Sequence, residues 1–310
     1  MQSPVPVNAA NTISVVIATY KRPLLLKRCV EQIHHQLDAS DEIVIANDDP
    51  TTEISDRAFN IIGGAPIKIV NNSGLHGPSA ARNYGIMSAS NDIILFADDD
   101  DYMRSGFITS LRETLKAHPD ADYGGANVLF AELLDTFEDR EPPPLEIAKR
   151  VTKAKDLLFG AGCGMWFKKH HLHALGMFDV DLINTEDVDL CLRAAALKLK
   201  CYRLGAQWIV VNRGEHNEET SITKKTNDKD KIRGWWKVYL NAQRCLPFYS
   251  KIRIELLERF VRRAIKKGFL VTCLKRLFRI PHDPLFLLAL LYFVLQSIDY
   301  GISNVVNRKP

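Results

Sequence analysis

Two kinds of hydrophobic pattern alternate along the first part of the chain. Four short runs are almost wholly apolar and rich in β-branched residues, at residues 13–18, 43–46, 67–70 and 93–97. Stretches with helical spacing of apolar residues lie at 22–36, 79–89 and 105–117. Strands without polar alternation are buried on both faces, and their alternation with helices predicts an α/β fold with a mostly parallel sheet.

The predicted strands end in polar residues. In parallel sheets, ligands gather outside the carboxyl ends of the strands. Here these ends read Thr19-Tyr20, Asn47-Asp48-Asp49 and Asp98-Asp99-Asp100-Asp101. We therefore expect a ligand site at this edge of the sheet.

The rest of the chain has fewer strand signals. A proline-rich loop is expected at 138–144, a turn at 176–179 and a helix at 186–198. Because no obvious linker divides this part from the first, residues 1–245 are predicted to form one catalytic domain. Residues 246–310 are predicted to form a helical appendage.

Charge is distributed unevenly along the chain. The 310 residues are 46% hydrophobic and 25% charged, which excludes a disordered or collagen-like protein. The net charge of +4 hides a net −4 over residues 1–250 and a net +8 over residues 251–282, which carry 10 basic and 2 acidic side chains. Such a segment is expected to meet an anionic surface.

The basic segment also has amphipathic spacing. Apolar and cationic residues interleave over 251–280, which is typical of a helix that lies on an anionic membrane leaflet. The alternative is a basic helix that covers the protein's own core. A nucleic-acid partner is not expected, because no binding motif is present. The longest uncharged apolar run, 285–298, has 14 residues, short of the ~20 that span a bilayer, so it either enters the membrane interface or packs on the body.

The six cysteines and the N-terminus indicate the compartment. The cysteines are scattered without a CxxC pair, as expected of buried thiols in a reducing compartment. The first residues lack the basic and apolar regions of a signal peptide. We expect a cytoplasmic protein, peripheral on the inner face of the cell membrane.

The acidic run at 98–101 is the strongest chemical signal. Four consecutive carboxylates repel one another unless a cation is present. Alternate carboxylates at a strand end can coordinate Mg²⁺ or Mn²⁺ together with a diphosphate. The alternative is a solvated acidic turn, but the position at the end of a buried strand favours the metal site.

Five stretches of the chain, taken together, resemble a family 2 glycosyltransferase with the nucleotide-sugar-binding GT-A fold. They occur in the family's order and spacing and cover about two-thirds of the chain, which makes the resemblance far more specific than any single motif. They are ISVVIATYKRP at 13–23, EIVIANDDPTTE at 42–53, GPSAARNYGI at 77–86, DIILFADDDD at 92–101 and GMFDVDLINTEDVDLCLRAA at 176–195.

The resemblance implies a donor site. Thr19 and Asp48 match residues that hold the nucleotide base and ribose. Asn47 replaces an acid that is common in the family, which leaves open the residue that reads the base. Arg82 matches a nucleotide contact, and Ser79 is expected to cap the helix N-terminus that attracts a diphosphate.

The metal site follows from the same resemblance. Asp98 matches a ligand of the ribose or the metal, and Asp100 matches the ligand of a metal that bridges the diphosphate. Asp101 is expected to support them. A divalent ion here would act as a Lewis acid on the departing nucleoside diphosphate. His216 lies where some relatives supply another metal or diphosphate contact, although a lone histidine is more often structural.

The acceptor side is implied by the motif at 185–190. Asp187 matches the general base that takes the proton of the acceptor hydroxyl, and Glu186 is expected to orient the acceptor. Helix electrostatics alone would also explain acids after an N-cap at Thr185, but they do not explain the whole motif. Single displacement with inversion is implied.

Two further features have open interpretations. Gly162 and Gly164 resemble small residues that let a sugar approach the backbone, and a tight turn explains them equally well. Trp235 and Trp236 are candidates for stacking on sugars, for a membrane interface or for simple core packing.

The predicted function is transfer of a sugar from a nucleotide-diphosphate donor, with a UDP-sugar expected, to a saccharide or lipid-linked glycan. The product would belong to cell-surface polysaccharide or lipopolysaccharide. One alternative is a metal-dependent nucleotidyltransferase, which would need an early glycine-rich basic loop that YKRP does not supply. The other is an inactive nucleotide-sugar-binding protein, against which the intact Asp98, Asp100 and Asp187 argue.

Overall fold

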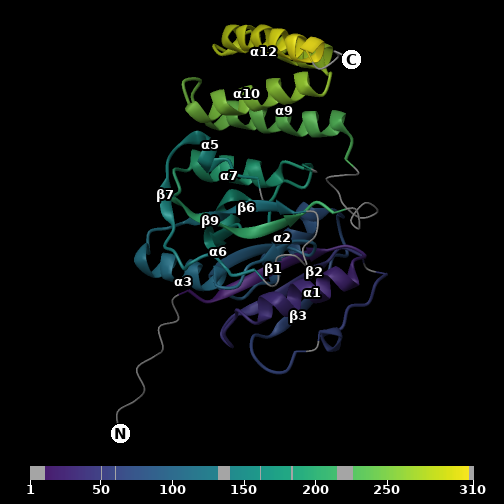
Figure 1. Cartoon of the computed structure of the whole chain (residues 1–310), viewed down its shortest axis with the longest axis vertical. Coiled ribbons are helices and arrows are strands. Elements are labelled where there is room, and N and C mark those ends of the chain that lie inside the picture. The colour runs from purple at the N-terminus through teal and green to yellow at the C-terminus, as the bar shows by residue number, and fades with distance from the viewer. Residues whose placement is uncertain are drawn as a thin grey trace. The chain divides into compact units, whose positions relative to one another are not determined.

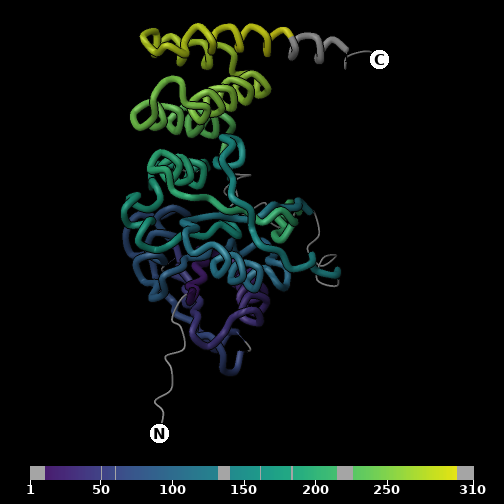
Figure 2. The backbone as a smooth tube through the Cα atoms, turned by 90° about the vertical axis from the view of Figure 1, so that its left-hand side faces the viewer, coloured from purple at the N-terminus to yellow at the C-terminus, as the bar shows by residue number. Residues whose placement is uncertain are grey.

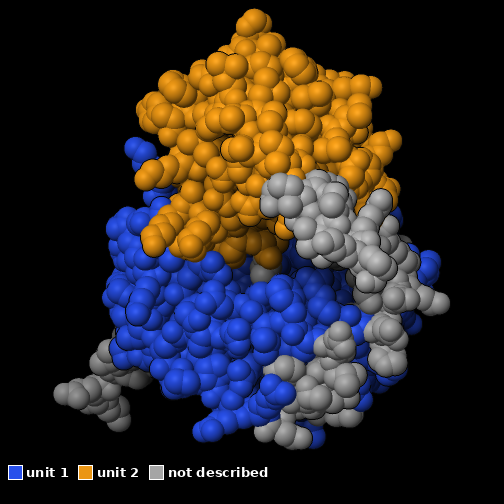
Figure 3. Space-filling view, turned by 45° about the horizontal axis from the view of Figure 1, so that its top comes forward, with its two compact units in different colours: residues 1–152, 161–181, 198–221 blue, residues 153–160, 182–197, 222–310 orange. Residues whose placement is uncertain are grey.

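The computed structural model describes residues 11–49, 51–59, 61–131, 140–160, 162–182, 184–214 and 226–306, with side chains to residue 298. The chain divides into two compact units (Figure 3). Each unit has a hydrophobic core of its own. Unit 1 comprises residues 1–152, 161–181 and 198–221. Unit 2 comprises residues 153–160, 182–197 and 222–310.

Unit 1 is built on a β-sheet (Figure 1). The sheet has nine strands in the order β3-β2-β1-β4-β8-β6-β9-β5, and β7 also pairs with β9. The strands are β1 (Ile13–Thr19), β2 (Glu42–Asn47), β3 (Ile67–Asn71), β4 (Ile93–Asp98), β5 (Tyr102–Met103), β6 (Tyr123–Ala131), β7 (Lys149–Val151), β8 (Trp166–Lys168) and β9 (Cys201–Asn212).

The four predicted strands are confirmed to within one residue at each end. β1, β2 and β4 are almost fully buried, as their unbroken apolar sequences predict. β3, β2, β1 and β4 are parallel, whereas β8 joins β4 antiparallel. The predicted α/β class is therefore confirmed. Besides these four strands, β6 and β9 also pair parallel, whereas the pairs β5–β9, β6–β8 and β7–β9 are antiparallel.

Helices flank this sheet. They are α1 (Pro23–His34), the short 3-10 helix η1 (Asp56–Ala58), α2 (Pro78–Ser88), α3 (Phe107–Ala117) and α6 (Lys169–Leu175). In α1, Leu26, Val30 and Ile33 lie on one face at helical spacing and are buried in the unit 1 core. The first helical residue of α1 and of α2 is a proline. Proline suits this position because a backbone N–H there would have no hydrogen-bond acceptor within the helix.

Gly85 lets α2 approach the sheet closely. A Cβ atom at this position would lie 2.4 Å from Cγ1 of Val16, which is fully buried in β1. We expect Gly85→Ala to lower the free energy of unfolding by about 1–3 kcal/mol, the usual cost of overpacking a core. Chemical denaturation would measure it. Gly205→Ala is the matched control, because its Cβ would meet only Glu146 Oε2 at 3.4 Å. An equal loss in both variants would contradict the close packing.

Unit 2 is helical. Its helices are α5 (Ala154–Leu157), α7 (Glu186–Ala196), α9 (Asp228–Cys245), α10 (Lys251–Lys266), α11 (Leu270–Leu277) and α12 (Phe286–Val306). α7 contacts α9, α9 contacts α10, and α10 contacts α12 (Figures 1 and 2). Thus α7 and α9, which lie within the 1–245 range assigned to the catalytic domain, share a unit with residues 246–310.

The apolar face of α10 belongs to the unit 2 core. Leu257, Phe260 and Val261 are buried there together with residues of α9 and α12. The prediction that this apolar face of the basic segment lies on a membrane is therefore wrong, and the alternative of a basic helix that covers the core describes α10. A hydrophobic-moment pattern is the same whether the apolar face meets lipid or protein.

Several cations of the basic segment have structural partners. The buried Arg253 forms an ion pair with Asp283, which also accepts hydrogen bonds from Tyr239 Oη at 2.7 Å and Gln243 Nε2 at 2.8 Å. Arg259 Nη1 donates to the carbonyl oxygen of Leu158 at 2.7 Å. These cations contribute to the fold of unit 2 as well as to its surface charge.

The tryptophan pair also packs in unit 2. Trp236 contacts the rings of Tyr239 and Phe260, and the guanidinium of Arg263 lies 4.1 Å from the ring centroid of Trp235. Both indoles are buried or nearly so. Core packing is therefore the correct interpretation of Trp235 and Trp236.

Five of the six cysteines are buried free thiols, as predicted, whereas Cys245 is exposed at the end of α9. Among the helices that the structure describes, none is both long and apolar enough to cross a bilayer.

Candidate functional site

The sheet register brings the polar strand ends of unit 1 together. Thr19 of β1 pairs with Asn47 of β2, and Ala18 pairs with Asp98 of β4. Asn47 in turn pairs with Asn71 at the end of β3. The predicted polar edge is therefore present, and it places three of the expected donor-site positions on adjacent strands.

Arg22 and Thr19 hold the acidic run that follows β4. Thr19 Oγ1 donates to Asp99 Oδ2 at 2.7 Å. Arg22 Nη1 lies 2.7 Å from Asp99 Oδ1 and 3.0 Å from Asp100 Oδ2. The residue that ends β1 and the residue that precedes α1 thus organise two of the four aspartates.

Burial makes the negative charge of this run costly. It raises the pKa of Asp99 to about 7, against the opposing effect of Arg22. Burial also raises the pKa of Asp100, and it raises that of Asp101 well above the usual range, with the charges of Asp98 and Asp100 adding to the effect. A cation bound beside these carboxyls would favour their ionised forms and so offset the effect of burial.

Asp98 is paired with Arg82 across the sheet edge. Arg82 Nη2 donates to Asp98 Oδ1 at 2.7 Å, and the Arg82 side chain is 8% exposed. The guanidinium also lies 5.6 Å from the ring centroid of Phe178, which packs edge-on against Phe96 of β4 at 5.1 Å. The predicted nucleotide contact Arg82 and the predicted ligand Asp98 are therefore neighbours.

Asn83 fixes the segment that supports Arg82. Its Nδ2 donates to the carbonyl oxygen of Phe178 and its Oδ1 accepts from the Phe178 N–H, both at 2.9 Å. These two hydrogen bonds join α2 to the turn at 176–179. They hold the Phe178 ring beneath the guanidinium of Arg82.

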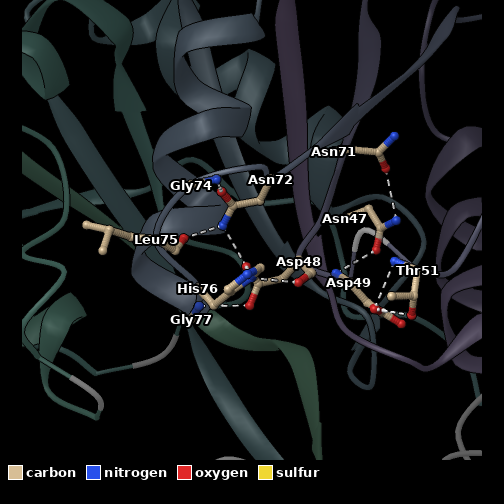
Figure 4. Close-up of polar contacts among 10 residues, drawn as sticks. All are labelled: Asn47, Asp48, Asp49, Thr51, Asn71, Asn72, Gly74, Leu75, His76 and Gly77. Atoms are coloured by element: carbon tan, nitrogen blue, oxygen red, sulfur yellow. Dashed lines mark hydrogen bonds and ion pairs between the residues drawn. The ribbon is translucent and has the colours of Figure 1, made fainter.

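Asp48 organises the loop that leads into α2 (Figure 4). Its Oδ1 accepts from Asn72 Nδ2 at 2.6 Å, and its Oδ2 accepts from the Gly77 N–H at 2.8 Å. The Nδ1 atom of His76 lies 3.5 Å from Asp48 Oδ1. Asp48 is thus a structural anchor of the 72–77 loop, and a contact with the nucleotide stays a prediction.

The start of α2 differs from the prediction. The N-cap residue is Gly77, with φ of 120°, and Pro78 is the first helical residue. Ser79 is buried one position further on, so its expected role as the cap is wrong. Glycine suits this position because its φ is positive. Asp48, which follows β2, holds the cap by accepting the Gly77 N–H.

Asn47 is committed to hydrogen bonds within the protein (Figure 4). Its Nδ2 donates to the Thr52 carbonyl oxygen at 2.9 Å and to Asn71 Oδ1 at 3.0 Å, while its Oδ1 accepts from the Asp49 N–H at 3.0 Å. Hydrogen bonds from Thr52 and Thr51 lower the pKa of Asp49. Asn47 therefore shapes the loop that follows β2, through its hydrogen bonds to Asp49 and Thr52. The residue that reads the base stays open.

Gly162 leaves room for the Arg82–Asp98 pair. A Cβ atom at this position would lie 2.9 Å from Arg82 Nη2 and 3.1 Å from Asp98 Oδ2. Close approach to these side chains, rather than a positive φ, explains why a glycine suits this position. Gly164, with φ of 78°, instead occupies the left-handed conformation of a turn.

We expect Gly162→Ala to weaken nucleotide binding about tenfold, because the methyl group displaces the Arg82–Asp98 pair by a few tenths of an ångström or more. Isothermal titration calorimetry with a nucleoside diphosphate would measure the affinity, and thermal melting would show whether the fold is kept. Gly205→Ala is the control. Unchanged affinity in Gly162→Ala would mean that the pair is not part of the binding site.

The predicted acceptor-side residues lie in unit 2. α7 begins at Glu186, after the N-cap residue Thr185, whose side chain makes no capping hydrogen bond. Glu186 is buried and Asp187 is half-buried, and Asp187 Oδ1 accepts from the Val188 N–H at 2.7 Å. Asp189, two residues after Asp187, accepts hydrogen bonds from Arg193 Nε and Asn241 Nδ2, both at 2.8 Å. The bond to Asn241 ties α7 to α9.

The predicted site residues are therefore distributed over the two units. Thr19, Asp48, Arg82, Asp98 and Asp100 lie in unit 1, and Glu186 and Asp187 lie in unit 2. His216 lies outside the described residues.

Comparison with known proteins decides the family. The model of glycosyl transferase family 2 matches residues 14–176, just over half of the chain. The chain belongs to glycosyl transferase family 2. It is a glycosyltransferase, and this membership argues against the nucleotidyltransferase alternative.

The curated proteins similar to this family 2 enzyme include two bacterial glycosyltransferases. An uncharacterized glycosyltransferase of Bacillus subtilis, YwdF, is 31% identical over 186 residues, which cover 59% of this chain and 68% of the relative. The GalNAc(5)-diNAcBac-PP-undecaprenol beta-1,3-glucosyltransferase of Campylobacter jejuni is 26% identical over 158 residues. That match covers 50% of each chain.

Solved structures show the same fold. S. aureus TarS 1-349 in complex with UDP-GlcNAc has a TM-score of 0.65 at 15% identity, over 96% of this chain and 92% of that one. The mannosyltransferase PcManGT of Pyrobaculum calidifontis, in complex with GDP-Man and Mn²⁺, has a TM-score of 0.56 at 13% identity, over 97% and 89%. The fold of this family 2 enzyme is therefore GT-A.

The donor set suits a hard divalent ion with few protein ligands. Within the described ranges, no group of three or more His, Cys, Asp or Glu side chains is arranged to hold a metal. Mg²⁺ is commonly bound by one or two carboxylates together with substrate phosphates and water. Asp98 and Asp100 fit that mode, since their side chains are 26% and 20% exposed, whereas that of Asp99 is 3% exposed. The metal at this site stays a prediction.

Two contributors to this site were not assigned a role from the sequence. Arg22 lies in YKRP directly after β1, and the repulsion expected among four aspartates was a signal that a cation would lie beside them. Asn83 had no such signal, because its partner Phe178 is 95 residues away along the chain.

Proposed function

We propose that this glycosyltransferase transfers a sugar from a nucleoside-diphosphate sugar, with uridine as the base, to a glycan or lipid-linked glycan acceptor during cell-surface polysaccharide biosynthesis. The observation that supports it most is the acidic run after β4, with Asp98 and Asp100 beside Arg82 and Arg22. A guanidinium matches phosphate geometry, so the presence of both arginines beside the acidic run supports a diphosphate as ligand.

The relatives support the class of acceptor. The Campylobacter jejuni relative is named for an undecaprenol-linked glycan, and an Erwinia amylovora relative, 27% identical over 45% of its length, is named for amylovoran biosynthesis. The S. aureus neighbour was solved with UDP-GlcNAc. An acceptor carried on a lipid would place the enzyme at the inner face of the membrane.

In the proposed mechanism, the nucleotide lies along the carboxyl ends of β1, β2 and β4. Thr19 and Asp48 contact the base and ribose, and Arg82 contacts the diphosphate. A divalent ion, Mg²⁺ or Mn²⁺, held by Asp98 and Asp100, would neutralise charge on the leaving diphosphate.

Transfer is a single displacement with inversion at the anomeric carbon. The acceptor hydroxyl oxygen forms a bond to the anomeric carbon as the bond to the diphosphate oxygen breaks, and the nucleoside diphosphate leaves with that electron pair. The Asp187 carboxylate takes the hydroxyl proton, and Glu186 orients the acceptor. An α-linked donor would then give a β-linked product.

A panel of nucleotide-sugars tests this function. We expect one donor class to be hydrolysed slowly without acceptor, with release of nucleoside diphosphate, when Mn²⁺ or Mg²⁺ is present. Transfer to a lipid-linked glycan would be read by mass spectrometry. No turnover of any nucleotide-sugar, with or without metal and acceptor, would overturn the proposal.

A further inference from the structure

Helix α12 exposes a continuous apolar face. Leu287, Leu291 and Leu295 are 75%, 58% and 54% exposed, and Val294 and Ile298 are 51% and 54% exposed. These five residues have the spacing of one side of a helix. We call this surface the outer face of α12.

The opposite face of α12 is already used. Ala289 is 1% exposed and belongs to the unit 2 core, and Phe286, Leu290 and Phe293 pack against that core. The hydroxyl of Tyr292 accepts from Arg262 Nη2 of α10 at 3.1 Å. The helix is therefore held in unit 2 by one side, while its outer face has no polar residues between 287 and 295.

Exposed cations and aromatic residues lie close to the start of α12. Phe278, 58% exposed, packs edge-on against Phe286 with the ring centroids 5.5 Å apart. Lys275 and Arg279 flank Phe278 in sequence, and both are exposed. Arg262 adds a third exposed cation in contact with α12.

We propose that the outer face of α12 lies in the interface of an anionic lipid bilayer, with Lys275, Arg279 and Arg262 on lipid phosphates. An apolar helix face of this kind lies in the plane of the interface, and nearby lysines and arginines bind anionic headgroups. The inference rests on the proposed function only in that a lipid-linked acceptor would be found there.

The charge of this region selects a membrane over a second copy of the chain. Residues 251–282 carry a net charge of +8. Two such segments brought face to face would repel each other, whereas an anionic leaflet attracts the same charge. The membrane contact predicted from the sequence is thereby assigned to α12 and the end of α11, and the apolar face of α10 has no part in it.

Flotation of the full chain with lipid vesicles tests the proposal. We expect binding to phosphatidylcholine vesicles that contain phosphatidylglycerol, and weak binding to phosphatidylcholine alone. The double variant Leu291→Asp/Leu295→Asp should lower the bound fraction at least about tenfold, because charged groups now face the acyl boundary. Ile62→Asp/Met87→Asp, which changes the net charge equally at exposed apolar positions of unit 1, should bind as the wild type does.

A second variant tests the membrane contact without any change in α12, in case the aspartates disturb the folding of that helix. Lys275→Gln/Arg279→Gln should weaken binding to the anionic vesicles and make it less sensitive to salt. Wild-type-like flotation of Leu291→Asp/Leu295→Asp would overturn the proposal. Failure of the wild type to float would also overturn it. The same holds if the wild type does not float but is a dimer that Leu291→Asp/Leu295→Asp dissociates, because the outer face would then bind a second copy of the chain.

The same proteins separate this inference from the proposed function. Asp98→Asn should float like the wild type but lose donor hydrolysis, whereas Leu291→Asp/Leu295→Asp should hydrolyse donor in solution but fail to float. If the wild type floats but hydrolyses no donor, the proposed function has failed. If it hydrolyses donor but does not float, the membrane inference has failed.

Discussion

Replacing Asp100 by asparagine is expected to lower the rate of sugar transfer by about a hundred- to ten-thousandfold, the effect of losing several kcal/mol of transition-state stabilisation. The substitution removes one of the two carboxylates predicted to hold the metal, and it removes the ion pair between Arg22 and Asp100. Steady-state kinetics with a nucleotide-sugar donor would measure the rate, and electron paramagnetic resonance would measure Mn²⁺ affinity. Both should fall, while the melting temperature stays close to that of the wild type.

A surface aspartate provides the matched control for this substitution. Asp120 lies in unit 1 and forms an exposed ion pair with Lys200. Asp120→Asn makes the same chemical change away from the strand ends, and it should leave transfer and Mn²⁺ affinity unchanged. Full activity of Asp100→Asn, with unaltered Mn²⁺ affinity, would contradict the role given to Asp100.

Asp187→Asn is expected to lower kcat about a hundred- to ten-thousandfold, the usual contribution of a positioned general base. An amide of the same shape cannot take the acceptor proton, so donor affinity should remain unchanged. Single-turnover kinetics and calorimetry with the donor separate these two quantities. Retained turnover in this variant would refute the assignment of the base.

The neighbouring Asp189 shows what a structural acid on the same helix should do. It is 1% exposed and accepts hydrogen bonds from Arg193 and Asn241. Asp189→Asn should therefore lower the melting temperature, whereas Asp187→Asn should not. If both variants lost stability equally, the loss of activity in Asp187→Asn could not be ascribed to proton transfer.

The sequence predicts the parallel half of the sheet well, because its signals are local. Each of β1, β2 and β4 is an unbroken apolar run, and such runs are typical of strands that are covered on both faces. The polar residues that follow them then converge by topology alone. The acidic run and its place at the carboxyl end of a strand could thus be predicted before any contact was known.

Contacts between distant parts of the chain explain most of what the sequence did not predict. Serine is the better helix cap by propensity, but Asp48 binds the N–H of Gly77 across 29 positions and moves the start of α2. The pairing of Asn83 with Phe178 spans 95 positions. The residues next to Asp48 and Asn83 in the sequence do not indicate that these side chains bind Gly77 and Phe178.

The C-terminal helices show a different limit. Helices α10 and α12 both carry apolar residues at helical spacing, yet those of α10 are buried in unit 2 and the outer face of α12 is exposed. Amphipathic spacing shows only that a helix has an apolar side. Which surface that side meets depends on the packing of α9, α10 and α12 together.

Nucleoside diphosphate binding with and without metal tests the central claim most directly. Calorimetry of the full chain with UDP, GDP and other nucleoside diphosphates should find one that binds in the presence of Mn²⁺. Its affinity should be at least about tenfold lower in EDTA, since a metal held by Asp98 and Asp100 would offset the charge of the diphosphate. In Asp98→Asn the same ligand should bind weakly under both conditions. If no nucleoside diphosphate binds, or if Asp98→Asn and EDTA leave its affinity unchanged, the strand ends of unit 1 are not a metal-dependent nucleotide-sugar site.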